Sequence, residues 1–113
     1  MSWFGTEKQW HKVAESELEL DFGSNGIAVA EIQGKKICIG RHQGNLRAFQ
    51  HKCPHASGLL SSGYIDALGN AVCPLHRYKF CLANGRNVSG EGYFLKTAAV
   101  RVDDQGVFVE GIF

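Results

Sequence analysis

The stretch from Cys53 to Gly85, CPHASGLLSSGYIDALGNAVCPLHRYKFCLANG, decides the fold of this 113-residue chain. Both prolines of the chain lie in it, and each directly follows a cysteine that has a histidine close behind it. The first unit is Cys53-Pro54-His55, and the second is Cys73-Pro74-Leu75-His76. Two thiols and two imidazoles carried on two loops form a donor set that can hold a metal centre.

Local geometry indicates that the two units can meet. In an extended segment alternate side chains point the same way, so Cys53 and His55 can face a common point. The second unit is one residue longer, so its two side chains must meet across a turn. Gly69-Asn70 lies midway between the units and is flanked by Tyr64-Ile65 and Ala71-Val72. This pattern predicts a hairpin, which would bring the two loops to the same end.

The donor set leaves two kinds of metal centre open. Two cysteines and two histidines are standard ligands of tetrahedral zinc. Zinc fingers, however, usually place two cysteines on one unit and two histidines on the other, whereas each unit here supplies one of each. The mixed pattern favours a [2Fe–2S] cluster in which two histidines replace two cysteines on one iron. Zinc remains the alternative.

This region resembles the cluster-binding region of Rieske-type ferredoxins, with a fainter similarity from Trp10 to about Glu110. It carries the C-x-H and C-x-x-H units and four further matching residues: Leu60, Gly63, Phe80 and Gly85. The resemblance implies one Rieske-type [2Fe–2S] cluster, bound through the four side chains of Cys53, His55, Cys73 and His76. The cysteines would bind the inner iron and the histidines the outer one.

The resemblance also implies an all-β class and a Rieske fold. In that fold an antiparallel sheet forms the base, and a small cluster-binding subdomain is inserted into it. We expect a single domain over residues 1–113, with the subdomain at about 50–86.

Several positions depart from the high-potential members of the family. Rieske proteins of cytochrome complexes carry one extra cysteine in each loop, joined by a disulfide, where this chain has Gly58 and Leu75. They also place a serine and a tyrosine after the second histidine, where this chain has Tyr78 and Phe80. With fewer hydrogen bonds to sulfur, we expect a reduction potential near the low end of the range, about −150 mV. Ser57, where related ferredoxins commonly have glycine, is a milder departure.

Composition narrows the class of protein further. A net charge of +1 argues against a nucleic-acid partner. The N-terminal MSWFGTEKQW has no signal-like apolar core, and no segment reaches the roughly 18 apolar residues that a membrane span requires. We therefore expect a soluble cytoplasmic protein with no membrane partner.

The rest of the chain has the periodicity of β-structure. Strands are predicted at 27–32, 36–41, 46–51, 99–103 and 107–110, and the alternation of Leu18, Leu20 and Phe22 indicates another. Turns are predicted at Gln33-Gly34-Lys35, Gln43-Gly44-Asn45 and Asp104-Gln105-Gly106. One short helical turn is expected near Glu15 to Leu18.

The other cysteines and histidines have structural interpretations. Cys38 and Cys81 are predicted to be small buried apolar side chains, and a reducing cytoplasm argues against a disulfide between them. His11 and His42 are expected on the surface. His51 is interpreted as solvated, or as part of a docking surface near the first loop.

The ligand loops are also locally basic. Lys52, Arg77 and Lys79 flank the two units. They are interpreted as solvated charge, with the alternative that they steer acidic partners toward the metal centre.

The resemblance implies a one-electron carrier that passes electrons from a flavin-dependent reductase to a terminal oxygenase. One alternative is the small Rieske-like subunit of an NAD(P)H-dependent nitrite reductase, with a sirohaem protein as acceptor. Another is a module without redox activity that zinc staples together. The chain has no histidine after His76 for a mononuclear iron triad, and no G-x-G-x-x-G fingerprint, so we expect no catalysis by the chain alone.

Overall fold

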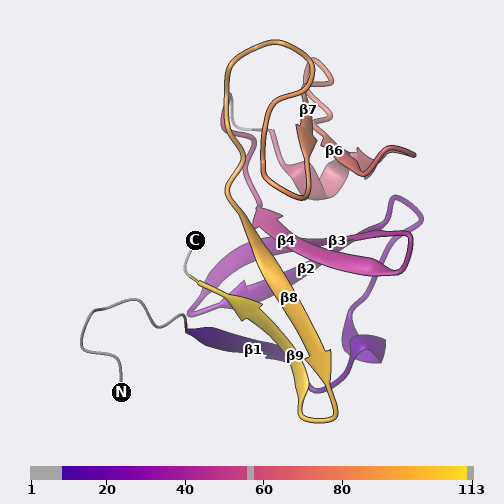
Figure 1. The fold of residues 1–113 in the computed structure, drawn as a ribbon, viewed down its shortest axis with the longest axis vertical. Helices are drawn as coiled ribbons and strands as arrows, with labels where there is room; N and C mark the ends of the chain where they lie inside the picture. The colour runs from indigo at the N-terminus through magenta and orange to yellow at the C-terminus, as the bar shows by residue number, and fades with distance from the viewer. Residues whose placement is uncertain (1–8, 56–57, 112–113) are drawn as a thin grey trace.

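The computed structural model describes residues 9–55 and 58–111, which form two antiparallel sheets of nine short strands in all (Figure 1). The all-β prediction is therefore confirmed. The expectations for residues 1–8 and for Ser57 concern positions outside the described residues. No helix in the described part of the chain has the length and apolarity that crossing a membrane would need.

The larger sheet has six strands in the order β1-β9-β8-β4-β3-β2. Its strands are β1 (Trp10–Ala14), β2 (Ile27–Ile32), β3 (Lys35–His42), β4 (Asn45–Gln50), β8 (Thr97–Asp103) and β9 (Gly106–Glu110). The sheet curls so that its two outermost strands, β1 and β2, contact each other. Curling encloses one face of the sheet and forms the base of the molecule (Figure 1).

The smaller sheet consists of β5 (Tyr64–Ile65), β6 (Asn70–Val72) and β7 (Lys79–Cys81). It lies between β4 and β8 in the sequence and stands above the base in Figure 1. The predicted hairpin is confirmed, because Tyr64 pairs with Val72 and Ile65 pairs with Ala71. The hairpin carries the chain from the first cysteine unit to the second.

Two-residue turns join β2 to β3 and β3 to β4. Both central residues of each turn have positive φ: 52° and 80° at Gln33 and Gly34, and 51° and 80° at Gln43 and Gly44. Such turns match the right-handed twist of the flanking strands. The strands predicted on either side are confirmed to within about one residue, as is the turn between β8 and β9.

The alternation of Leu18, Leu20 and Phe22 does not mark a strand. The segment contains a 3-10 helix, η1 (Glu17–Glu19), and finds no neighbouring strand to pair with. Leu18 is 96% exposed, whereas Leu20 is buried and Phe22 packs beside it against the base. The expected helical turn overlaps η1. Strands β1 and β7 and a second 3-10 helix, η2 (Leu60–Ser62), were not predicted.

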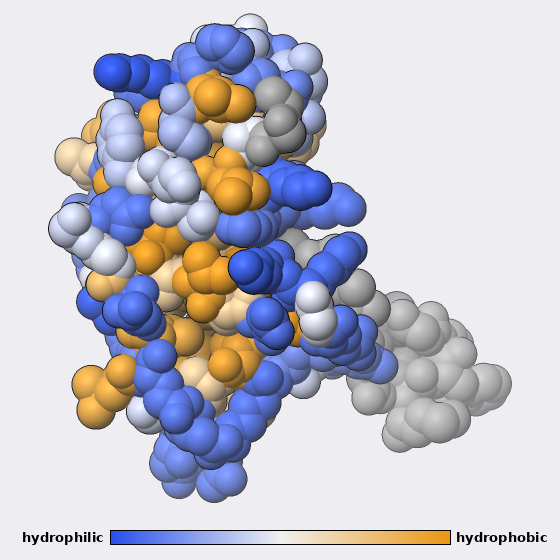
Figure 2. All heavy atoms as spheres, turned by 180° about the vertical axis from the view of Figure 1, so that it is seen from behind, coloured by the Kyte–Doolittle hydropathy of each residue, from blue (hydrophilic) through white to orange (hydrophobic). Residues whose placement is uncertain are grey.

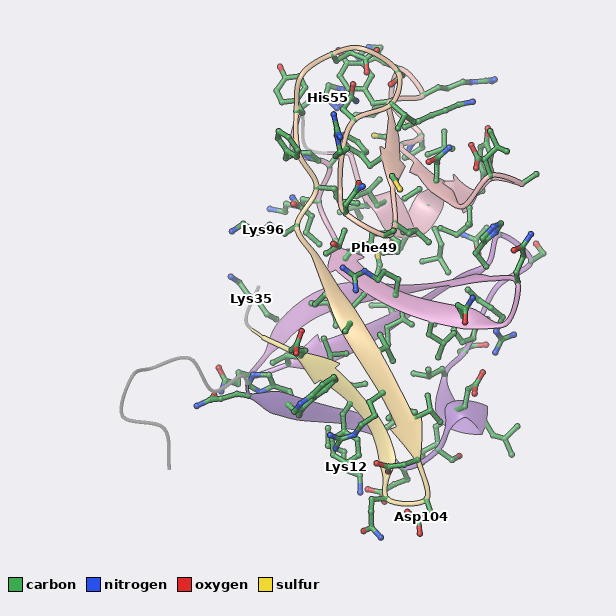
Figure 3. The ribbon with its side chains drawn as sticks, viewed as in Figure 1. Lys12, Lys35, Phe49, His55, Lys96 and Asp104 are labelled. Atoms are coloured by element: carbon green, nitrogen blue, oxygen red, sulfur yellow. The ribbon has the colours of Figure 1, made fainter. Side chains whose placement is uncertain are left out.

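Alternation along β3 and β4 separates two apolar cores. Ile37, Ile39 and Ala48 point into the core enclosed by the curled sheet. Cys38 and Phe49, one residue out of phase, point the other way into a core shared with the smaller sheet. Figure 3 places Phe49 at the junction of the two sheets. Central strands buried on both faces thus tie the smaller sheet to the base.

Seen from behind, apolar residues run down the middle of the molecule between hydrophilic margins (Figure 2). Eleven large apolar side chains are substantially exposed among the described residues, including Leu59, Leu75 and Phe94. Exposed apolar side chains that are scattered singly are normal on a protein surface.

The backbone at Gly85 packs closely against the backbone at Leu95, and this contact provides a test of the fold. Gly85 has a φ of 77°, and a Cβ there would overlap the carbonyl oxygen of Leu95. Gly44 has a φ of 80° but open space where its Cβ would lie. We expect Gly85→Ala to lower the free energy of unfolding by more than about 3 kcal/mol, and Gly44→Ala by only about 1 kcal/mol.

Urea denaturation followed by circular dichroism measures both changes. The two glycines share nearly the same φ, so the difference between the variants isolates the steric overlap. Equal losses for the two variants would contradict the close packing at Gly85.

Candidate metal centre

Both cysteine units form loops that close in the same way. The backbone N–H of Cys53 donates to the carbonyl of Gly58 at 2.8 Å, and that of Cys73 donates to the carbonyl of Tyr78 at 2.9 Å. Each loop therefore closes from a cysteine to the fifth residue after it. The second unit has one more residue between its cysteine and its histidine than the first. Its loop still closes over the same number of residues, and His76 adopts a φ of 63° there.

The two cysteines lie inside and the two histidines lie outside. Cys53 and Cys73 are 4% and 0% exposed and belong to the core shared by the two sheets. His55 is half-buried and His76 is exposed. His55 lies at the end of the molecule farthest from the turn between β8 and β9 (Figure 3). Sulfur donors thus face the core, and nitrogen donors face solvent.

Three of the four predicted ligands form one group of donor atoms. The Sγ atoms of Cys53 and Cys73 and a ring nitrogen of His55 all lie within 4.8 Å of one another. His55 Nδ1 lies 2.7 Å from Cys53 Sγ. His76 is outside this group, but its Nδ1 lies 3.2 Å from His55 Nε2. The two loops therefore bring all four side chains together at one end of the smaller sheet.

Gly58 and Leu75, which stand where high-potential relatives carry the disulfide, pack against each other. A Cβ on Gly58 would lie 3.0 Å from Cγ of Leu75 and 3.2 Å from Sγ of Cys73. The Leu75 side chain therefore fills the space between the loops, and apolar packing joins them in place of a covalent bond.

Aromatic rings surround His55. The ring of Tyr78 stacks on it with centroids 3.9 Å apart and planes inclined by 27°. Tyr93 approaches His55 at 6.0 Å and Tyr78 at 5.9 Å. Tyr78 was noted from its distance to the second histidine, but Tyr93 was missed. Its one sequence signal was the Tyr93-Phe94 pair after a glycine-flanked glutamate.

A hydrogen-bonded turn holds Glu91 near this aromatic group. Asn87 Nδ2 donates to Glu91 Oε1 at 2.9 Å, and the Ser89 hydroxyl donates to the same oxygen. The bond from Ser89, followed by that from Asn87, holds the pKa of Glu91 below its usual value despite some desolvation. Desolvation, and next the charge of Glu91, raises the pKa of Tyr78. A fixed negative charge therefore lies close to the two ligand loops.

Asp66 organises the hairpin between the loops. Its Oδ1 accepts from the N–H groups of Leu68 at 3.0 Å and Asn70 at 2.9 Å, and its Oδ2 accepts from Asn70 Nδ2 at 3.1 Å. Burial raises the pKa of Asp66, but the bonds from Asn70 and Leu68 and the charge of Lys79 outweigh it. The pKa is therefore below its ordinary value. The ionised carboxylate thus stabilises the turn.

The remaining cysteines differ in burial. Cys38 is fully buried, as predicted, and burial raises the pKa of its thiol to about 12. Cys81 is half-buried, so the prediction of a buried side chain was wrong there. It is the last residue of β7. Neither of these two cysteines is in a disulfide.

The other histidines are less exposed than expected. His51 Nε2 lies 2.9 Å from the Ser61 hydroxyl, so this side chain is bound to η2 and is only partly solvated. Burial, and next the charges of Lys36 and Lys52, holds the pKa of His51 below its ordinary value. His11 and His42 are half-buried.

The basic residues of the loops have different surroundings. Lys79 Nζ lies 3.9 Å from Asp66 Oδ2, so its charge is partly compensated within the hairpin. Lys52 and Arg77 are exposed. The steering role considered for these three residues stays a prediction.

The donor set fits an unevenly liganded iron–sulfur cluster. Two thiols reach the site from the apolar side and two imidazoles from the solvent side, one of each from either loop. Soft thiolates favour iron–sulfur clusters as well as zinc, so the donors alone do not choose between them. The division into an inner sulfur side and an outer nitrogen side matches a cluster with histidines on one iron.

Comparison with known proteins identifies the protein family and, with it, the kind of metal centre. Residues 9–93 match the family described as the Rieske [2Fe-2S] domain. The match covers most of the chain, and this chain belongs to that family. Its cofactor is a Rieske-type [2Fe–2S] cluster.

Relatives of known type extend the comparison. The ferredoxin subunit of 3-phenylpropionate/cinnamic acid dioxygenase from Photorhabdus laumondii is 30% identical over 74 residues, covering 65% of this chain and 70% of that protein. A chain in the complex of reduced oxygenase and oxidized ferredoxin of carbazole 1,9a-dioxygenase aligns with a TM-score of 0.74 at 25% identity, covering 90% and 93% of the two chains.

A third similarity concerns the fold alone. A protein described as the small subunit of an NADH-dependent nitrite reductase from Mycobacterium tuberculosis aligns with a TM-score of 0.77 at 16% identity, covering 95% of this chain and 98% of that one.

The Asp66 carboxylate makes the stability of the hairpin depend on pH. We expect Asp66→Asn to lower the free energy of unfolding at pH 7 by about 1–2 kcal/mol, because the buried Asn70 amide loses its acceptor. The folded-state pKa is depressed, so this stabilisation is present above the unfolded pKa. It is lost as the pH falls through the lower folded pKa.

Urea titrations from neutral to acidic pH, followed by tryptophan fluorescence, measure the difference between the two proteins. Asp104→Asn, at the far exposed turn (Figure 3), is the control and is expected to change little. A difference for Asp66→Asn that stays constant into strong acid would show that the carboxylate is not the cause.

Proposed function

We propose that this chain is a one-electron carrier whose cluster is held by Cys53, His55, Cys73 and His76. When bound, a [2Fe–2S] cluster accepts and releases a single electron. Cys53 and Cys73 would hold it on the core side, and His55 and His76 on the solvent side. The observation that carries the proposal is this division between buried sulfurs and outward imidazoles on two loops that close identically.

The position of the histidines supports exchange of electrons with another protein. His55 lies at one end of the molecule (Figure 3), and the exposed His76 lies beside it, with Nδ1 3.2 Å from His55 Nε2, so a partner can approach both. The core around the two cysteines excludes water from the sulfur side, because Phe80, Leu60 and Phe49 are fully buried there. The chain therefore offers one route for electrons, through its imidazole end.

The comparisons suggest which partners to test. Ferredoxin subunits of dioxygenase systems are among the relatives, so a terminal oxygenase is the proposed acceptor. A flavin-dependent reductase as donor is a proposal from the family resemblance. The chain would act as an electron-transfer component and catalyse no reaction by itself.

Two further expectations stay predictions. The first is a single domain over 1–113 with a subdomain at about 50–86, and the second is the cytoplasmic location.

The nitrite reductase subunit remains the second candidate. The similarity to the Mycobacterium tuberculosis protein supports it at the level of the fold. Copurification of a sirohaem protein with the chain from its native host would favour this candidate. Electron transfer to an oxygenase encoded nearby would favour the carrier.

Metal analysis and redox titration test the proposal directly. Anaerobically purified protein is expected to contain two irons and two acid-labile sulfides per chain, with a midpoint potential of about −150 mV. Stoichiometric zinc without sulfide would contradict the carrier function and favour the non-redox module held together by zinc.

Substitution of the outer ligands tests their assignment. His55→Cys and His76→Cys each add a thiolate charge, so we expect a lower midpoint potential or loss of the cluster. His42→Cys, a half-buried histidine on β3, is the matched control and should leave the potential unchanged. An intact ligand variant with the parental potential would contradict the assignment.

A further inference from the structure

A basic hollow lies beside the first ligand loop, and none of the four proposed ligands is among the residues that line it. Its volume is about 450 Å³. The residues that line it come from three segments of the chain: Gly34, Lys35, Lys36, Gln50, His51, Lys52 and Lys96. We call this feature the lysine hollow. Hollows of this size are within the range of small-molecule sites.

Four of the seven lining residues are lysines. They approach from the start of β3, from the chain just after β4, and from the chain just before β8. Figure 3 shows Lys35 and Lys96 extending from the same edge of the molecule, below His55. On the corresponding edge in Figure 2, strongly hydrophilic side chains project into solvent. Segments distant in sequence thus concentrate positive charge at one place.

No carboxylate lines the hollow among the residues that the structure describes. Glu31 is the cross-strand neighbour of Lys36 in the pairing of β2 with β3, but it is not part of the lining. The chain as a whole has a net charge of only +1, so this concentration of charge is local. The ammonium groups of Lys36, Lys52 and Lys96 repel one another, and an anion in the hollow would relieve that repulsion.

Gln50 holds two of the three segments in place. Its backbone N–H donates to the carbonyl of Lys96 at 3.1 Å, and its Oε1 accepts from the Lys96 N–H at 2.7 Å. Its Nε2 donates to the carbonyl of Lys52 at 2.7 Å. These bonds fix the backbone from which the Lys52 and Lys96 side chains extend. The hollow is therefore a built part of the junction between the two sheets.

We propose that the lysine hollow binds an anion that bears two or more phosphate charges. Lysine binds phosphate as a point charge, and several ammonium groups around one concave space match an anion with several charges on neighbouring centres. A single carboxylate would neutralise one lysine and leave the others. The concave shape favours a small anion over a flat acidic protein surface. This binding does not depend on the carrier function.

Isothermal titration calorimetry of the full chain with its cluster tests the proposal, with inorganic pyrophosphate as the probe at constant ionic strength. We expect one pyrophosphate per chain. The triple variant Lys36→Gln/Lys52→Gln/Lys96→Gln should bind at least about tenfold more weakly, because it loses three charged donors. A triple variant with arginine at the same positions keeps the charge and should retain binding.

A matched control removes the same number of charges elsewhere. Lys12→Gln/Arg86→Gln/Arg101→Gln should bind pyrophosphate as the parent does. Figure 3 shows Lys12 at the opposite end of the base. Should the triple glutamine variant fail to fold, the single variants Lys36→Gln and Lys96→Gln provide the same comparison, with a smaller loss of affinity expected for each.

Three results would overturn the proposal. Parental affinity in the lysine variants would place the anion elsewhere. An equal loss in the control would reveal a general effect of charge. Tighter binding of a hexaglutamate peptide than of pyrophosphate would make the hollow a docking patch for acidic proteins. None of these results bears on iron content or midpoint potential, so the carrier function is tested separately.

Discussion

Burial of the two cysteine side chains in the core between the sheets is the constraint on which the site depends. Phe49 from the base and Phe80 from the smaller sheet are both fully buried there, next to Cys53 and Cys73. Replacing either phenylalanine with alanine would open a cavity at an expected cost of about 3–5 kcal/mol. The same packing that joins the sheets thus holds both sulfur donors on the inner side of the site.

The loops convert this burial into an asymmetric site. Each loop closes from its cysteine to a carbonyl five residues on, and in each loop the histidine is more exposed than the cysteine. Leu75 packs on Gly58 and joins the loops where other branches of the family use a disulfide. A joint made by packing leaves the loops more dependent on the hairpin beneath them, where the Asp66 carboxylate accepts hydrogen bonds from the backbone and side-chain N–H groups of Asn70.

The features that could be predicted from the sequence are those that depend on a local pattern of residues. Alternation located most strands, and glycine after glutamine located the turns whose two residues both require positive φ. The spacing of the two Cys-Pro units identified the four proposed ligands. Features that arise from contacts between distant segments were missed. Leu18 alternates like a strand residue but meets no partner strand, Tyr93 reaches His55 only in the folded chain, and the lysine hollow draws on three separate segments.

The central claim is that nitrogen from His55 and His76 binds one iron while both sulfurs bind the other. Electron-nuclear double resonance on reduced protein labelled with ¹⁵N-histidine tests it most directly. The account predicts two strongly coupled nitrogens, one lost when His55 is replaced by cysteine and the other when His76 is. A reduced cluster with no strongly coupled nitrogen, or with both couplings intact in either variant, would contradict it.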